Sequence, residues 1–153
     1  MDTQKTSEVL NALIEINNDR IEGYETASTE TKEVDLKLLF SQFIQTSNHC
    51  KSELVEEVHH LGYAILEGTR LSGKFFRVWM DVKAALTGNN TKLILDSCEY
   101  GENMALAAYD DVLKNSVDFI TPHQQSFLLA QKILLQVDHD RLKNLRDALE
   151  ENE

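Results

Sequence analysis

Helix-breaking residues are scarce in this chain, which holds one proline and six glycines among 153 residues. Between them run long stretches in which apolar residues recur every three or four positions, and no stretch alternates as a half-buried strand would. This period gathers the apolar side chains on one face of a helix. We therefore expect an all-α protein, and the chain length suits a single domain over residues 1–153.

The pattern predicts four long helices and a shorter fifth one. Gly62 ends the second helix, and Pro122, preceded by Thr121 as the cap and followed by Gln124 as the closing member of a capping box, starts the last. In chain order the expected elements cover residues 6–27, 34–61, 74–86 (the shorter helix), 91–115 and 122–151. Short connections within each pair of long helices, with a longer crossover between the pairs, are typical of one class of four-helix bundle.

The charge and the cysteines narrow the function classes. A formal net charge of −11 repels nucleic acid and anionic membranes, and its simplest role is solubility. Cys50 and Cys98 lack CxxC spacing, which indicates buried free thiols in a reducing compartment. No apolar run approaches the length of a membrane span or a signal peptide. We expect a cytoplasmic protein.

The two halves of the chain echo one another. Asn17 and Tyr24 are separated by the same spacing as Glu102 and Tyr109. Cys50, with Glu53 three positions later, follows Asn17 at nearly the same separation at which Gln136, with His139 three positions later, follows Glu102. The pair Gln136/His139 has the i, i+3 spacing of a Glu-x-x-His motif. A helix pair has therefore been repeated.

This repeat resembles the ferritin-like superfamily. Rubrerythrins and bacterioferritins carry a glutamate seven residues before a tyrosine on helices 1 and 3, and Glu-x-x-His on helices 2 and 4. The resemblance implies a di-iron centre of four carboxylates and two imidazoles, and places its six ligand positions on Asn17, Cys50, Glu53, Glu102, Gln136 and His139. Only Glu102 and His139 keep the residue type of the family. Because the lost carboxylates would have supplied the charge that holds iron, we expect a neutral, hydrogen-bonded polar cluster instead.

A closer resemblance rests on the tracts "FFRVWMDVKAALTG", "CEYGENMALAAY" and "HDRLKNLRDA". They look like an uncharacterised bacterial ferritin-like family that is known only as a domain of unknown function. The resemblance covers nearly the whole chain, and it implies a four-helix bundle without assigned chemistry.

These features favour a non-enzymatic bundle with a degenerate di-iron site and no cofactor. It would act through an unknown protein partner or through self-association, and the ferritin-like resemblance implies a role in stress physiology. The alternative is an iron-storage protein or di-iron-type oxidoreductase with a reduced site. In that case Glu53, Glu102 and His139 would hold iron or another divalent metal, with Cys50 nearby. A homodimer through the crossover helix around Trp79 is compatible with both.

Three further groups have two interpretations each. The tract "ELVEEVHHLG" holds two Glu-x-x-His pairs, which form either a metal site or, more simply, a solvated helix face. The aromatic residues around Trp79 either dock a partner or pack on the bundle, as aromatic side chains at helical spacing usually do. Glu99 and Glu102, one turn apart, either pair with a base or a cation, or one of them, Glu99 rather than Glu102, forms an ordinary ion pair with Arg141 or Arg146.

Overall fold

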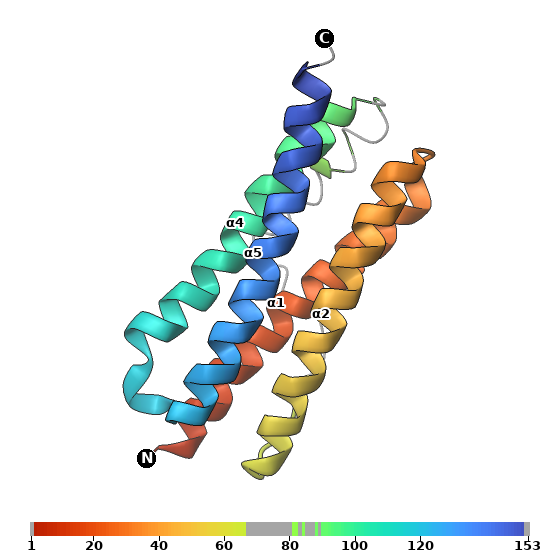
Figure 1. Cartoon of the computed structure of the whole chain (residues 1–153). Coiled ribbons are helices and arrows are strands. Elements are labelled where there is room, and N and C mark those ends of the chain that lie inside the picture. The colour runs from red at the N-terminus through yellow and green to blue at the C-terminus, as the bar shows by residue number, and fades with distance from the viewer. Residues whose placement is uncertain (1, 67–80, 83, 85–87, 89, 152–153) are drawn as a thin grey trace.

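The computed structural model describes residues 2–66, 81–82, 84, 88 and 90–151. These residues are helical apart from short connections, and they contain no strand. The elements are α1 (Thr3–Glu30), α2 (Val34–His60), α4 (Thr91–Asn115), the short 3₁₀ helix η1 (Val117–Phe119) and α5 (Pro122–Glu151). The prediction of an all-α chain with four long helices is confirmed (Figure 1).

Local capping explains where the helices begin and end. The side chain of Asp2 accepts a hydrogen bond from the Lys5 amide at 3.2 Å, which starts α1 three residues earlier than the apolar pattern indicated. Gly62 follows α2 with a φ of 85°, a left-handed conformation that ends the helix. The predicted capping box is confirmed, because the Gln124 amide donates to Thr121 Oγ1 at 3.1 Å and the Thr121 amide donates to Gln124 Oε1 at 2.8 Å.

The predicted crossover helix over residues 74–86 lies mostly outside the described residues. Asp81, Val82 and Ala84 are helical, and Val82 is buried in the core. The aromatic cluster around Trp79, and with it the predicted dimer interface, falls outside the described residues. The crossover helix therefore stays a prediction.

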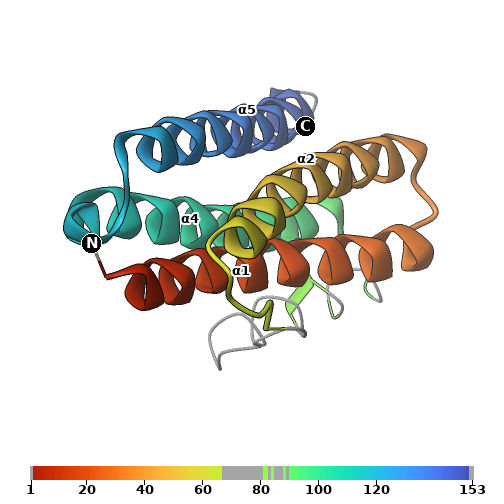
Figure 2. The same ribbon diagram turned by 90° about the horizontal axis from the view of Figure 1, so that it is seen from below.

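The helices form two antiparallel hairpins, α1 with α2 and α4 with α5 (Figure 1). Because α2 and α4 run in the same direction, α2 ends at one end of the molecule and α4 begins at the other. The chain leaves α2 across α1, where the Tyr63 hydroxyl bonds Thr3 Oγ1 at 2.9 Å and the Leu66 amide donates to Asn11 Oδ1 at 3.0 Å. This connection therefore departs over α1, whereas Figure 2 shows α5 on the far side of the molecule.

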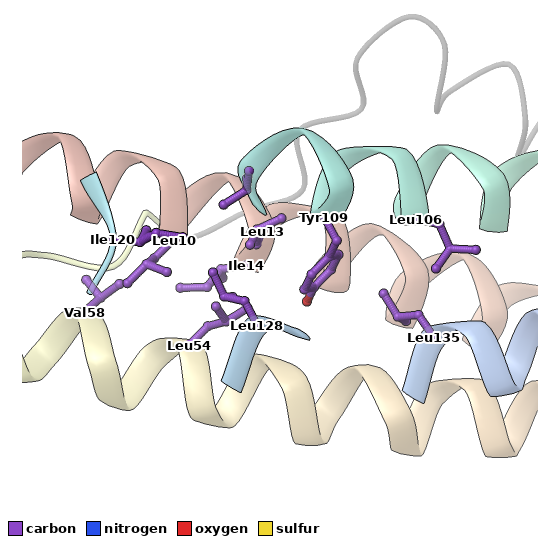
Figure 3. Close-up of a cluster of buried hydrophobic side chains, with 11 residues drawn as sticks. Leu10, Leu13, Ile14, Leu54, Val58, Leu106, Tyr109, Ile120, Leu128 and Leu135 are labelled. Carbon is purple, nitrogen blue, oxygen red and sulfur yellow. The ribbon is translucent and has the colours of Figure 1, made fainter. Parts of the chain in front are cut away.

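Among the described residues, two apolar clusters form the buried core, one toward each end of the helices. The first cluster includes Leu10, Ile14, Leu54, Tyr109, Leu128 and Leu135, and Figure 3 shows these side chains converging from all four helices. The second includes Tyr24, Phe40, Phe43, Leu95, Cys98 and Leu142. Every long helix contributes to both clusters, and between its two contributions each helix buries at least one polar side chain. The core is thus divided by a polar layer, which holds the candidate site.

Two neighbouring leucines on α5 allow a test of this packing. Leu135 is fully buried in the first cluster, whereas Leu134 is 38% exposed. We expect Leu135→Ala to lower the free energy of unfolding by about 2–5 kcal/mol, because it leaves a cavity. Leu134→Ala should lower it by less than about 1 kcal/mol. Urea denaturation followed by circular dichroism measures both, and equal losses would contradict the described orientation of α5.

Candidate functional site

The polar layer is built around one buried arginine. Arg20 points inward from α1 and is 2% exposed, and it meets Glu102 of α4 and Asp138 of α5, each 1% exposed. Ser47 completes the set from α2 and is fully buried. Each of the four long helices therefore contributes one polar side chain to the same depth of the bundle.

The guanidinium of Arg20 makes hydrogen bonds in several directions. Its Nε and Nη2 donate to Glu102 Oε1 at 3.2 and 2.9 Å, and Nη2 also donates to Asp138 Oδ2 at 3.3 Å. Nη1 donates to Ser47 Oγ. The guanidinium carbon lies 5.6 Å from the ring centre of Tyr24 and 5.7 Å from that of Phe43. Hydrogen bonds in the plane and aromatic faces around it are the surroundings that stabilise a buried guanidinium.

The protonation of the layer follows from burial and pairing. Burial opposes the charged form of Arg20, but Glu102, Tyr24 and Asp138 outweigh this effect and raise the pKa of Arg20 above its ordinary value. Burial raises the pKa of Asp138, although Arg20 works in the opposite direction. Glu102 Oε2 is buried and has no hydrogen-bond partner among the described residues. The layer is therefore a permanent cation facing two carboxyl groups.

The repeated residue pairs of the sequence are exchanged between the hairpins. The Tyr24 hydroxyl of α1 donates to Glu102 Oε1 of α4, and Asn17 Nδ2 of α1 donates to the Tyr109 hydroxyl of α4 at 2.9 Å. Tyr109 in turn donates to Gln131 Oε1 of α5 at 2.8 Å. Each tyrosine thus bonds the polar residue of the other half of the repeat.

The three predicted metal ligands have separate partners. Glu102 is buried and bonded to Arg20. Glu53 is 40% exposed, accepts a hydrogen bond from Gln131 Nε2 at 3.2 Å and lies 3.3 Å from His49. His139 is 15% exposed, and its Nε2 lies 3.9 Å from Glu99 Oε2. Among the described residues no group of three or more His, Cys, Asp or Glu side chains is arranged to hold a metal ion.

The remaining positions of the ferritin-like pattern, Asn17, Cys50 and Gln136, also lie in different surroundings. Asn17 and Cys50 are fully buried, and burial raises the pKa of the Cys50 thiol to about 12. Cys50 and Cys98 are free and buried, as their spacing indicated. Gln136, however, is exposed and bonds Asp140 Oδ1 at 3.1 Å. The expected neutral polar cluster is wrong in one respect, because its centre carries the charge of Arg20.

Sequence reasoning missed two of the central residues, and a signal for both was present. The inward residues of α5 follow alternate steps of four and three: Gln124, Leu128, Gln131, Leu135, Asp138 and Leu142. The sequence analysis predicted that His139 faces the core, but the inward position is occupied by Asp138, one residue earlier in the chain. On α1, Arg20 continues the stripe of Leu13, Asn17 and Tyr24 with the same steps.

The surface groups have simple partners. The predicted ion pair of Glu99 is confirmed, since Arg146 Nη1 lies 2.6 Å from Glu99 Oε1.

The tract with two Glu-x-x-His pairs borders a surface pocket of about 400 Å³ between the end of α2 and the start of α5. Its lining residues are Glu53, Glu56, Glu57, His60, His123 and Phe127. Glu57 accepts a hydrogen bond from Gln124 Nε2 at 3.0 Å, which ties the two helix ends together.

A third buried carboxyl group, next to Arg20 in sequence, lies outside the layer. Asp19 is 2% exposed, and its Oδ1 has no hydrogen-bond partner among the described residues. Burial, reinforced by the charges of Glu15 and Glu22, raises the pKa of Asp19 from 3.8 to about 7.

Comparison with known proteins identifies the class of this chain. Residues 5–115 match the model of the family described as Domain of unknown function (DUF2383). The match covers most of the chain, so the protein belongs to that family. It contains Arg20, Ser47 and Glu102, whereas α5 with Asp138 lies beyond it. No curated protein and no solved structure matches. None of the described helices is long and apolar enough to cross a membrane.

Removal of the arginine tests the layer. We expect Arg20→Met to lower the free energy of unfolding by about 3–5 kcal/mol, because it leaves Glu102 and Asp138 buried without their cation. Arg141→Met is the matched control, since Arg141 is 49% exposed and lies 3.8 Å from the same Asp138. It should cost less than about 1 kcal/mol. Chemical denaturation at neutral pH measures both, and similar losses would show that Arg20 does not hold the layer together.

Asp19 predicts a pH dependence of stability. Its pKa is higher in the folded chain than in the unfolded chain, so its stabilising contribution is fully present below about pH 4 and is lost as the pH rises through about 7. Asp19→Asn should therefore be more stable than the parent at about pH 8, and the difference should shrink toward about pH 4. Thermal unfolding across this range is the measurement, with Glu25→Gln, at an exposed position of α1, as the control. A difference that does not change with pH would refute the assignment.

Proposed function

We propose that this chain is a non-enzymatic, ferritin-like four-helix bundle in which an arginine takes the role of the metal ions. The bundle acts by protein interaction or self-association. The observation that carries this proposal is the position of Arg20, whose guanidinium bonds carboxyl groups from two other helices in the centre of the core.

The chemistry of the donor set does not fit a di-iron centre. Two iron ions need several ionised carboxylates whose lone pairs are free to coordinate. Here Glu102 Oε1 accepts hydrogen bonds from Arg20 and from the Tyr24 hydroxyl. A divalent cation placed between Glu102 and Asp138 would also be repelled by the guanidinium at close range in a low dielectric. The fixed cation therefore supplies the neutralisation that metal ions supply in a ferritin-like enzyme.

Three features support the ferritin-like relationship. The α2 and α4 helices are parallel and need a long crossover, as in bundles of this kind (Figure 1). The two hairpins repeat the spacing between a polar residue and a tyrosine, and each tyrosine bonds the other half of the repeat. The polar layer lies in the middle of the bundle, where facing helices build metal sites. The proposed role in stress physiology rests on the family resemblance alone.

The alternative of a reduced metal site at Glu53, Glu102 and His139 stays a prediction. In that site Glu102 would bind a metal ion in place of Arg20. Glu53 would have to give up its hydrogen bond from Gln131, and His139 its contact with Glu99. No contact of the described residues favours these exchanges over the present pairs.

Metal analysis separates the two functions. The parent chain is incubated with ferrous iron or zinc, desalted and analysed for metal content. We expect far less than one metal ion per chain, because the guanidinium of Arg20 repels a second cation at the carboxyl groups of the polar layer. We also expect the same result for His139→Ala. Near-stoichiometric metal in the parent would overturn the proposal, and its loss in His139→Ala would establish the alternative.

A further inference from the structure

The outer face of α5 carries a stripe of aliphatic side chains that the bundle does not bury. Leu129, Ile133 and Val137 are 50%, 56% and 41% exposed and follow one another at intervals of four residues, so they share one side of the helix. Leu134 borders them and is 38% exposed. Figure 2 shows that this helix lies at the edge of the molecule, with α4 and α2 to one side of it. We call these four residues the α5 stripe.

The electrostatics of the stripe differ from those of the rest of the chain. The sequence holds 26 acidic against 15 basic residues, yet no aspartate or glutamate occurs between Asp118 and Asp138. Two copies of a chain with a net charge of −11 repel each other over most orientations. The α5 stripe is a surface on which they can approach without bringing carboxylates face to face.

The polar residues beside the stripe already have partners. Lys132 forms an ion pair with Asp110 of α4, and Gln136 donates to Asp140 Oδ1 at 3.1 Å. A docking helix would therefore cover apolar surface without breaking these contacts.

We infer that the α5 stripe is a self-docking surface, on which the same helix of a second copy lies antiparallel about a two-fold axis at Ile133. The spacing is symmetric about that residue, so the axis places Ile133 against its own copy and Leu129 against Val137 of the second chain. A basic partner would bind the acidic surfaces and gain nothing from an uncharged stripe. This inference rests on the proposed function, because it names the partner and the surface through which a non-enzymatic bundle acts.

The small area of the stripe sets the strength of the contact. Four partly exposed aliphatic side chains offer much less than the ~800 Å² per partner of a standard protein interface. The dimer should therefore be weak and concentration-dependent. Because the attraction is apolar and the repulsion is between net charges, added salt should strengthen the association.

Sedimentation equilibrium of the full chain at rising concentration tests the inference. The mass of the parent should climb from that of the monomer toward twice that value, and more steeply in high salt. Ile133→Glu should remain a monomer, with its dissociation constant raised at least about tenfold, because the two-fold axis places the two glutamates together. Leu93→Glu, at a residue that is 52% exposed on α4, is the matched control and should associate as the parent does.

A charge-swap experiment tests the geometry. Ile133→Lys alone should also be a monomer, whereas a mixture of Ile133→Lys and Ile133→Glu should form a heterodimer, since the axis pairs opposite charges. Circular dichroism confirms that each variant is folded. A monomeric parent at every concentration, or an Ile133→Glu variant that associates as the parent does, would overturn the inference. Failure of the mixture to pair would overturn the antiparallel geometry. A metal-free monomer would leave the proposed function standing, whereas a metal-loaded chain would refute that function whatever its oligomeric state.

Discussion

A guanidinium that water cannot reach has to find its hydrogen-bond partners inside the protein, and this requirement organises the bundle around Arg20. Burial of a charge is costly, and the cost is offset only when the partners have good geometry. Glu102, Asp138 and Ser47 meet this condition from three different helices. Because hydrogen bonds are directional and apolar contacts are not, the layer fixes the depth at which the four helices meet.

The two apolar clusters and the layer between them have different physical roles. The clusters supply most of the stabilisation, because the burial of aliphatic and aromatic surface is the dominant favourable contribution to folding. Side chains in these clusters could be exchanged for others of similar volume at modest cost. The layer does not permit such exchange, since Arg20 bonds a defined partner on each of the other three long helices. The main effect of the layer is to specify a unique arrangement of the helices rather than to stabilise the fold.

The sequence predicts the helices better than it predicts the site, because a helix is indicated by many residues together and a site by a few single residues. The helix boundaries follow from many apolar positions and from caps such as Thr121 with Gln124, so a single misleading residue does little harm. The site depends on single positions. On α5 the register was wrong by one residue, which exchanged Asp138 for His139, and a helix turns by about 100° at each residue. Arg20 was missed because a long charged side chain is usually exposed, and only its partners on other helices show that it can be buried.

The same limit explains what the resemblance to metal-binding bundles could and could not provide. The spacing between a polar residue and a tyrosine survives in both halves of the chain, and each tyrosine bonds the polar residue of the other half. The spacing does not reveal that a cation from the protein itself lies between the carboxyl groups. That fact depends on tertiary proximity of Arg20 and Glu102, which are 82 residues apart in sequence.

The division of charge between the hairpins has one more consequence. The α1–α2 hairpin brings the cation of the layer, and the α4–α5 hairpin brings both carboxyl groups. Two α4–α5 hairpins that met face to face would bury four carboxyl groups without a counter-charge, and two α1–α2 hairpins would bury two guanidinium groups. Two identical hairpins therefore repel each other in the core, and each hairpin pairs favourably only with the other kind. The buried arginine thus disfavours the pairing of like hairpins from two different chains.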